Sequence, residues 1–210
     1  MLNIETIMRT SPVIPVIVID DMADAVPLAK ALVAGGLRVL EVTLRTEHGL
    51  AAIAAIKAAV PDAIVGAGTV LSADDVRNSK AAGAEFLVSP GNTPSLISAA
   101  AAENMLLLPG VSSPSEVMLL LEHGIKHMKF FPAVAAGGVG MLKSIAGPLP
   151  QVQFCPTGGI NLNNAGDFLA LPNVLCIGGS WMLAAADIRN KNWAEIEAQA
   201  RIASQLSCGG

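Results

Sequence analysis

The stretch VLEVTLRTEHGLAAIAAIKAAVPDAIVGAGTV, residues 39–70, contains two apolar runs separated by an alanine-rich segment. The runs VLEVTL and IVGAGTV have the composition of buried strands, and EHGLAAIAAIKAAV between them has that of a helix. A strand, a helix and a second strand within about thirty residues form the pattern of a βαβ unit. The two strands of such a unit run parallel, so this stretch predicts a parallel sheet.

The same unit recurs along the chain. Strand-like runs begin at Val13, Val39, Ile64, Phe86, Leu106, His127, Gln153 and Val174, between 20 and 26 residues apart. Eight strands alternating with helices predict a (β/α)8 barrel, the TIM-barrel fold, in preference to an open doubly wound sheet. We expect one domain over residues 1–210, with a helix over Leu2–Arg9 before the barrel and a last outer helix over Asn192–Leu206.

The composition describes a largely buried chain without a surface for nucleic acid. Hydrophobic residues make up 52% of the 210 residues and charged residues 14%, against about 25% charged in a typical soluble domain. The net charge is -4, and lysines and arginines form no cluster. Because nucleic-acid binding needs a basic face, we expect no nucleic-acid partner. The low share of charged residues is compatible with a subunit interface.

Cysteine usage and the apolar segments predict a cytoplasmic protein. The three cysteines, Cys155, Cys176 and Cys208, are an odd number, as expected for reduced thiols, and the start MLNIETIMRT is too charged for a secretion signal. The span Phe168–Ala186 carries no charge and approaches the ~20 residues of a membrane helix. Proline and glycine residues interrupt it, so we predict no membrane span.

Two charged side chains fall within the run VLEVTLR. Strand alternation places Glu41 and Arg45 on one face with Thr43, and leucine and valine side chains on the other. Because the aliphatic face belongs against the helices, Glu41 and Arg45 point toward the barrel mouth, where barrel enzymes place their active sites. An internal salt bridge that only fills the barrel explains this pattern equally well. Among groups that transfer protons, Glu41 is the strongest candidate.

The run HMKFFPA, residues 127–133, places one lysine in an otherwise buried strand. Alternation turns Lys129 and Phe131 inward, and Met128 and Phe130 outward against the helices. Burial favours the neutral form of an amine, and a neutral amine is the nucleophile that forms a Schiff base with a ketone. The alternative is a purely structural ion pair with Glu41, which is weak evidence of stabilisation. We favour the catalytic interpretation.

Hydroxyl and glycine residues at other strand ends indicate a site for a phosphorylated ligand. Thr69 ends GAGT in the third run, and paired glycines occur in TGG, residues 157–159, and GGS, residues 178–180. Barrel enzymes often bind phosphate after the seventh and eighth strands, where glycine lets backbone N–H groups approach the oxygens. The seventh and eighth runs are those that carry these pairs.

Metal chemistry is poorly supported. The histidines, His48, His123 and His127, show no short ligand spacing, and His127 falls at the amino-terminal end of its strand. No cysteine has a CxxC partner, and Cys155 and Cys176 are expected to be packing residues. We therefore expect neither a metal nor another cofactor.

Six motifs in order, LEVTLRT, GAGTV, SPG, KFFPA, CPTGGI and IGGSW, resemble the 2-keto-3-deoxy-6-phosphogluconate (KDPG) aldolases over nearly the whole chain. Members of that family are metal-independent class I aldolases on a (β/α)8 barrel, usually homotrimers, that split the phosphorylated sugar acid into pyruvate and glyceraldehyde 3-phosphate. The resemblance implies the same reaction here, on a phosphorylated keto-acid substrate, and the same trimer.

The resemblance also implies a role for each matching residue. Lys129 would form the Schiff base, Glu41 would be the general acid and base, and Arg45 with Thr69 would hold the pyruvate carboxylate. Pro90 and Phe131 would line the site, and Thr157 would face the hydroxyl-bearing carbons and influence the stereochemistry. Four residues would cradle the phosphate: Gly158, Gly159, Gly179 and Ser180.

One departure and several alternatives accompany the resemblance. Relatives often read FFPAEANGG, whereas this chain reads FFPAVAAGG, so Val134 and Ala136 replace an acid and an amide near the site. The substrate could instead be the phosphogalactonate epimer or 4-hydroxy-2-oxoglutarate (KHG). A phosphosugar isomerase or a non-catalytic phosphosugar-binding barrel, with a structural Lys129–Glu41 pair, is the more distant alternative.

Overall fold

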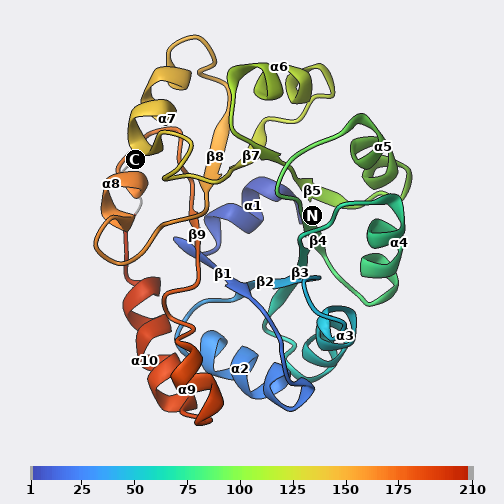
Figure 1. The fold of residues 1–210 in the computed structure, drawn as a ribbon, viewed down its shortest axis with the longest axis vertical. Coiled ribbons are helices and arrows are strands. Elements are labelled where there is room, and N and C mark those ends of the chain that lie inside the picture. Colours follow the sequence, from blue (N-terminus) through green and yellow to red (C-terminus); the bar gives the residue numbers. More distant parts are fainter. Residues whose placement is uncertain (1, 208–210) are drawn as a thin grey trace.

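In a computed structural model that describes residues 2–207, parallel strands curl into a barrel surrounded by helices (Figure 1). Cys208 lies outside the described residues. The strands are β1 (Val13–Ile17), β2 (Val39–Thr43), β3 (Ile64–Gly68), β4 (Phe86–Val88), β5 (Leu106–Leu108), β6 (Gly110–Val111), β7 (His127–Phe130), β8 (Gln153–Pro156) and β9 (Ile177–Gly179).

The strands follow one another around the barrel in two sheets. One sheet has the order β5-β4-β3-β2-β1-β9, and the other has the order β6-β7-β8. Bridges between Phe154 and Val174 and between Thr157 and Gly178 connect β8 with the β9 segment. The fifth predicted strand is divided into β5 and β6 at Pro109, because proline has no N–H to donate. The predicted α/β barrel is confirmed.

The helices pack around the outside, except for α1 at one end of the barrel (Figure 1). They are α1 (Ile4–Arg9), α2 (Met22–Ala34), α3 (Gly49–Ala59), α4 (Ala73–Ala81), α5 (Pro94–Ala102), α6 (Pro114–Glu122), α7 (Gly138–Ala146), α8 (Ala165–Leu169), α9 (Ala185–Arg189) and α10 (Trp193–Ser204). Helices α1 and α10 are the two terminal helices that the sequence predicts. Among the described residues, no helix is long and apolar enough to cross a bilayer.

One detail differs from the predicted elements. The eighth strand begins at Ile177 rather than Val174, because the backbone N–H of Val174 closes a turn onto the carbonyl of Leu171. Lys191 lies in the turn between α9 and α10 with a φ of 55°. Its ammonium binds the buried carboxylate of Asp24 on α2.

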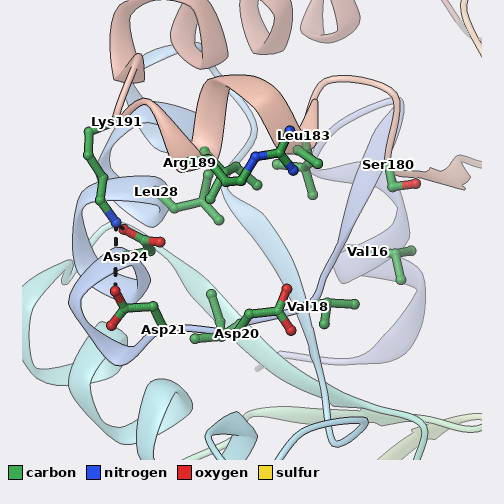
Figure 2. A pocket seen from close by; sticks show the side chains of 13 residues that line it. Val16, Val18, Asp20, Asp21, Asp24, Leu28, Ser180, Leu183, Arg189 and Lys191 are labelled. Carbon is green, nitrogen blue, oxygen red and sulfur yellow. Dashed lines mark hydrogen bonds and ion pairs between the residues drawn. The ribbon is translucent and has the colours of Figure 1, made fainter.

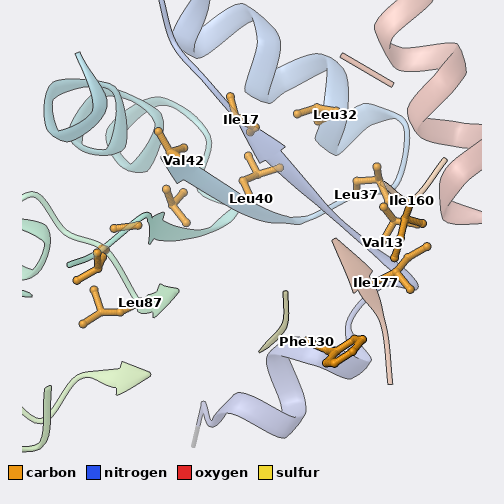
Figure 3. Close-up of a cluster of buried hydrophobic side chains, with 14 of the residues drawn as sticks. Val13, Ile17, Leu32, Leu37, Leu40, Val42, Leu87, Phe130, Ile160 and Ile177 are labelled. Atoms are coloured by element: carbon orange, nitrogen blue, oxygen red, sulfur yellow. The ribbon is translucent and has the colours of Figure 1, made fainter. Parts of the chain in front are cut away.

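The barrel separates two apolar cores. The larger core fills the space between strands and helices and includes Val13, Ile17 and Phe130 (Figure 3). The smaller core fills the barrel interior, where Ile14 of β1 packs with residues that include Ile7 of α1. The alternation predicted for β7 is confirmed, since Met128 and Phe130 belong to the outer core. Helix α1 therefore closes the amino-terminal end, which leaves the carboxyl-terminal end as the mouth.

Candidate active site

Lys129 and Glu41 meet inside the barrel. The Nζ atom of Lys129 donates to Oε1 of Glu41 across 3.1 Å, and the two side chains are only 5% and 4% exposed. Lys129 comes from β7 and Glu41 from β2, which are not neighbours in either sheet, so the pair spans the interior. A hydrogen bond of this kind can pass a proton from the ammonium to the carboxylate. The arrangement can thus produce a neutral amine next to a carboxylic acid.

The strand register leaves space for the glutamate side chain. Glu41 lies opposite Gly66 on β3, and a Cβ atom at Gly68 would collide with the Glu41 carboxylate and lie 2.6 Å from its Cγ. The absence of a side chain at Gly68 therefore leaves the space that the Glu41 carboxylate occupies beside Lys129. The sequence contained a signal for it, a glycine within a strand, which indicates close approach by another group.

Phe131 lies beside the amine, as predicted. Its ring centroid is 5.4 Å from Nζ of Lys129, within the range of a cation–π contact. The peptide bond to Pro132 is cis, and the next backbone N–H, of Ala133, donates to the carbonyl of Thr157. A backbone hydrogen bond thus joins the segment after β7 to the segment after β8, next to Lys129.

Arg45 and Thr69 meet at the ends of the neighbouring strands β2 and β3. The Nε atom of Arg45 donates to Oγ1 of Thr69 across 3.3 Å, and the Arg45 side chain is exposed. Thr69 has a φ of 61°, a left-handed backbone conformation that costs of order 1–3 kcal/mol and that clusters at functional sites. The guanidinium retains N–H groups that can bind a carboxylate in a bidentate manner.

Pro90 follows β4 and is half-buried. Its backbone lies so close to Gly110 of β6 that a Cβ atom on that glycine would collide with it, and Gly110 is the strand partner of Lys129. Strand β6 therefore lies between Pro90 and Lys129. It also lines a small cavity of about 230 Å³ with Leu71 and Leu96 among the other lining residues.

The residues predicted to bind phosphate follow β8 and β9. Thr157 is buried and bridges to Gly178, while Ser180 is exposed directly after Gly179, the last residue of β9. Gly158 and Gly159 have φ values of 106° and 76°, which L side chains rarely adopt. These strand ends adjoin one another, so the hydroxyls and the glycine-rich backbone lie on the same side of the mouth.

Val134 also lies at this side of the mouth. It is 48% exposed, its backbone N–H donates to the carbonyl of Gly158, and a Cβ atom at Gly159 would lie 2.9 Å from its Cβ. Ala136 is half-buried against the outer core. An apolar side chain therefore borders the paired glycines.

A cavity of about 580 Å³ opens between the ends of β1 and β9 and the helices α2 and α9 (Figure 2). Its apolar wall includes Val16 and Leu28, and its polar groups come from residues that include Ser180 and Arg189. Neither Lys129 nor Glu41 lines this cavity. The cavity lies beside the Lys129–Glu41 pair, because Val16 is the strand partner of Glu41.

The histidines lie away from the Lys129–Glu41 pair. His127 is at the start of β7, where its Nε2 is 3.9 Å from Glu5 of α1, and burial lowers the pKa of its imidazole. His48 and His123 flank α3 and α6. Within residues 2–207, no three His, Cys, Asp or Glu side chains are grouped as metal ligands.

A parallel barrel with a buried amine and carboxylate beneath an open mouth defines the chain as a (β/α)8-barrel enzyme. The family described as KDPG and KHG aldolase matches residues 4–199. The KHG/KDPG aldolase of Escherichia coli K12 is 54% identical over 197 residues, which are 94% of this chain and 92% of that protein. The 2-dehydro-3-deoxy-phosphogluconate aldolase of Pseudomonas aeruginosa PAO1 is 48% identical, covering 95% and 90% of the two chains.

Solved structures lead to the same family. The KDPG aldolase of Legionella pneumophila, with pyruvate captured as a covalent carbinolamine intermediate, superimposes with a TM-score of 0.94 at 49% identity, covering 96% of this chain and 98% of that one. The KDPG aldolase of Zymomonas mobilis ZM4 gives a TM-score of 0.92 at 50% identity, covering 98% and 97%. The chain belongs to the KDPG and KHG aldolase family, as its sequence motifs predict.

Proposed function

We propose that the chain is a Schiff-base aldolase that reversibly cleaves KDPG to pyruvate and D-glyceraldehyde 3-phosphate. The observation that carries the proposal is the buried Lys129–Glu41 hydrogen bond of 3.1 Å at the mouth of the barrel. We assign the whole chain, residues 1–210, to this aldolase domain.

The reaction begins with proton transfer within the pair. Nζ of Lys129 passes a proton to Glu41 and attacks the C2 carbonyl carbon, forming a carbinolamine. Glu41 then returns a proton to the C2 hydroxyl, which leaves as water and produces an iminium. The positive iminium is the electron sink that the next step requires.

Carbon–carbon cleavage follows on the iminium. The Glu41 carboxylate removes the C4 hydroxyl proton, the C3–C4 bond breaks, and its electron pair forms an enamine while the aldehyde leaves. Glu41 then protonates C3, and water hydrolyses the imine to release pyruvate and restore the amine. One carboxyl group at hydrogen-bond distance from Nζ serves all these transfers, which fits general acid–base catalysis.

The remaining residues hold the substrate. Arg45, supported by Thr69, pairs with the carboxylate of the pyruvate portion, while Phe131 and Pro90 line the site. Thr157 faces the hydroxyl-bearing carbons. Four residues form the phosphate cradle: Gly158, Gly159, Gly179 and Ser180. Each of these groups is at the carboxyl end of a strand, which is where the substrate of a barrel enzyme binds.

Activity on KHG is a second candidate, because the E. coli relative carries the double name KHG/KDPG aldolase at 54% identity. KHG has the same keto-acid end, so the Lys129 and Arg45 contacts serve both substrates. The test is pyruvate release from each substrate, with and without a metal chelator. We expect activity on KDPG that survives chelation, since no step above needs a metal, and absence of pyruvate release from both substrates would overturn the proposal.

We further propose a cytoplasmic homotrimer. The low charged share of 14% and the exposed side chains of Leu71 and Met118, which are 61% and 57% exposed, support a subunit interface. A trimeric mass in light scattering is expected, and a monomeric mass at working concentration would contradict it.

A further inference from the structure

We propose that the 580 Å³ cavity between β1, α2, β9 and α9 receives the aldehyde-side end of the substrate, and that Arg189 pairs there with the terminal phosphate. The inference rests on the proposed function and adds a specificity-determining residue to it. Arg189 belongs to none of the sequence motifs that indicate a phosphate site.

The cavity is an extension of the barrel mouth. Val16 and Val18 line it, and alternation along β1 from Ile14, which packs inside the barrel, turns Val16 inward. Val16 is also the strand partner of Glu41. On the opposite side the cavity reaches Ser180, directly after β9. One wall of the cavity is therefore adjacent to the proton-transfer residue, and another carries a hydroxyl of the proposed phosphate cradle.

Two basic side chains line the cavity, Lys191 and Arg189, and of these Arg189 is available to bind an anion. Lys191 is occupied, because its ammonium binds Asp24 and lies 3.8 Å from Asp21. Arg189 and Asp20 make no ion pair or side-chain hydrogen bond with the residues the structure describes. Figure 2 shows the Arg189 side chain extending along the cavity toward Leu183, on the side of Ser180, whereas Lys191 turns to the aspartates.

The shape and charge of the cavity favour a terminal anion on the Arg189 side. A volume of about 580 Å³ falls within the roughly 300–1,000 Å³ of small-ligand sites. A guanidinium presents parallel N–H groups that match two phosphate oxygens. Asp20 lies on the opposite wall in Figure 2 and repels an anion, so it directs the phosphate toward Ser180 and Arg189.

The test compares two substrates that differ only in the phosphate, KDPG and 2-keto-3-deoxygluconate. Arg189→Gln should lower kcat/KM for KDPG by about tenfold, the scale of one partly exposed charge-assisted hydrogen bond, and leave the value for the unphosphorylated substrate unchanged. Arg189→Lys should restore part of the loss, since it keeps the charge without the fork. High salt should narrow the difference between wild type and Arg189→Gln.

The matched control is Arg77→Gln, an exposed arginine on α4. It should leave the ratio of the two kcat/KM values unchanged. If cleavage of the unphosphorylated substrate is too slow to measure, competitive inhibition by glycerol 3-phosphate provides the same comparison, and its inhibition constant should rise about tenfold in Arg189→Gln alone.

Two results would overturn the inference: an unchanged preference for the phosphorylated compound in Arg189→Gln, or equal losses on both substrates. Failure of the proposed function is distinguishable, because pyruvate carries no phosphate and its imine with Lys129 does not involve Arg189. A protein that forms the pyruvate imine yet shows no effect of Arg189→Gln keeps its function and loses only this inference.

Discussion

Replacing Glu41 with glutamine removes the acid and base that both imine formation and carbon–carbon cleavage use. Glutamine has the same shape and keeps an oxygen that can accept the 3.1 Å hydrogen bond from Lys129, but it cannot take up the C4 hydroxyl proton. General acid–base help is worth about 10²- to 10⁴-fold, or ~2.7–5.4 kcal/mol of activation free energy at ~1.36 kcal/mol per decade. We therefore expect a loss of turnover in this range.

The assay has two readouts on the same preparation. Pyruvate release measures turnover, and the fraction of Lys129 peptide modified after pyruvate and borohydride measures imine formation. Removal of one partner from a buried ion pair costs up to about 3–5 kcal/mol of stability, so urea unfolding must first establish that the variant is folded. The control is Glu122→Gln, an exposed glutamate at the end of α6. Wild-type turnover in folded Glu41→Gln would refute the assigned role.

Two further changes test the surroundings of the pair and the local stability of the barrel. Gly68→Ala should displace the Glu41 carboxylate, since the new Cβ would lie 2.6 Å from Cγ and 2.9 Å from Cδ of Glu41, and turnover should fall by up to about 10²-fold. The control is Gly166→Ala, where a Cβ atom meets nothing within 4 Å and turnover should stay unchanged. Equal turnover in the two variants would contradict this prediction. Glu116 forms the capping box of α6; burial raises the pKa of this carboxyl, but hydrogen bonds from Ser112 and Ser113 outweigh that effect and lower it. Its stabilisation is therefore present above the unfolded pKa of about 4.3 and is lost as the pH falls through the lower folded value. Glu116→Gln should cost about 0.5–1.5 kcal/mol at pH 7, the scale of a net hydrogen bond, and progressively less below pH 4, as measured by urea unfolding, whereas a cost independent of pH would exclude this origin.

The central pair was predictable because alternation in a parallel strand has only two faces. Once β2 and β7 are placed against the outer helices by their aliphatic side chains, Glu41 and Lys129 have no direction left except inward. Their meeting across 88 residues of sequence follows from barrel closure, since β2 and β7 enclose the same interior. Six ordered motifs then identified the family.

The cavity beside the mouth was not predictable in the same way. Arg189 lies in α9, a helix of five residues without a buried side chain, so no apolar periodicity marks it. Asp20 and Lys191 lie in connecting segments, whose positions depend on the packing of α2 and α9. Lys191 in particular binds Asp24 across 167 residues, a contact that no local pattern contains. Side chains outside the strands carry the proposed specificity, while strand residues carry the chemistry, and strand alternation made the chemistry easier to predict.

The most direct test of the proposed mechanism is mass spectrometry of the protein after incubation with pyruvate and borohydride. Reduction of an imine fixes the pyruvate carbon to the nitrogen that formed it. We expect one adduct per chain, on Lys129, accompanied by loss of aldolase activity and absent from Lys129→Arg. An unmodified Lys129 peptide in inactivated protein, or an adduct on another lysine, would contradict the proposal that this buried amine is the nucleophile.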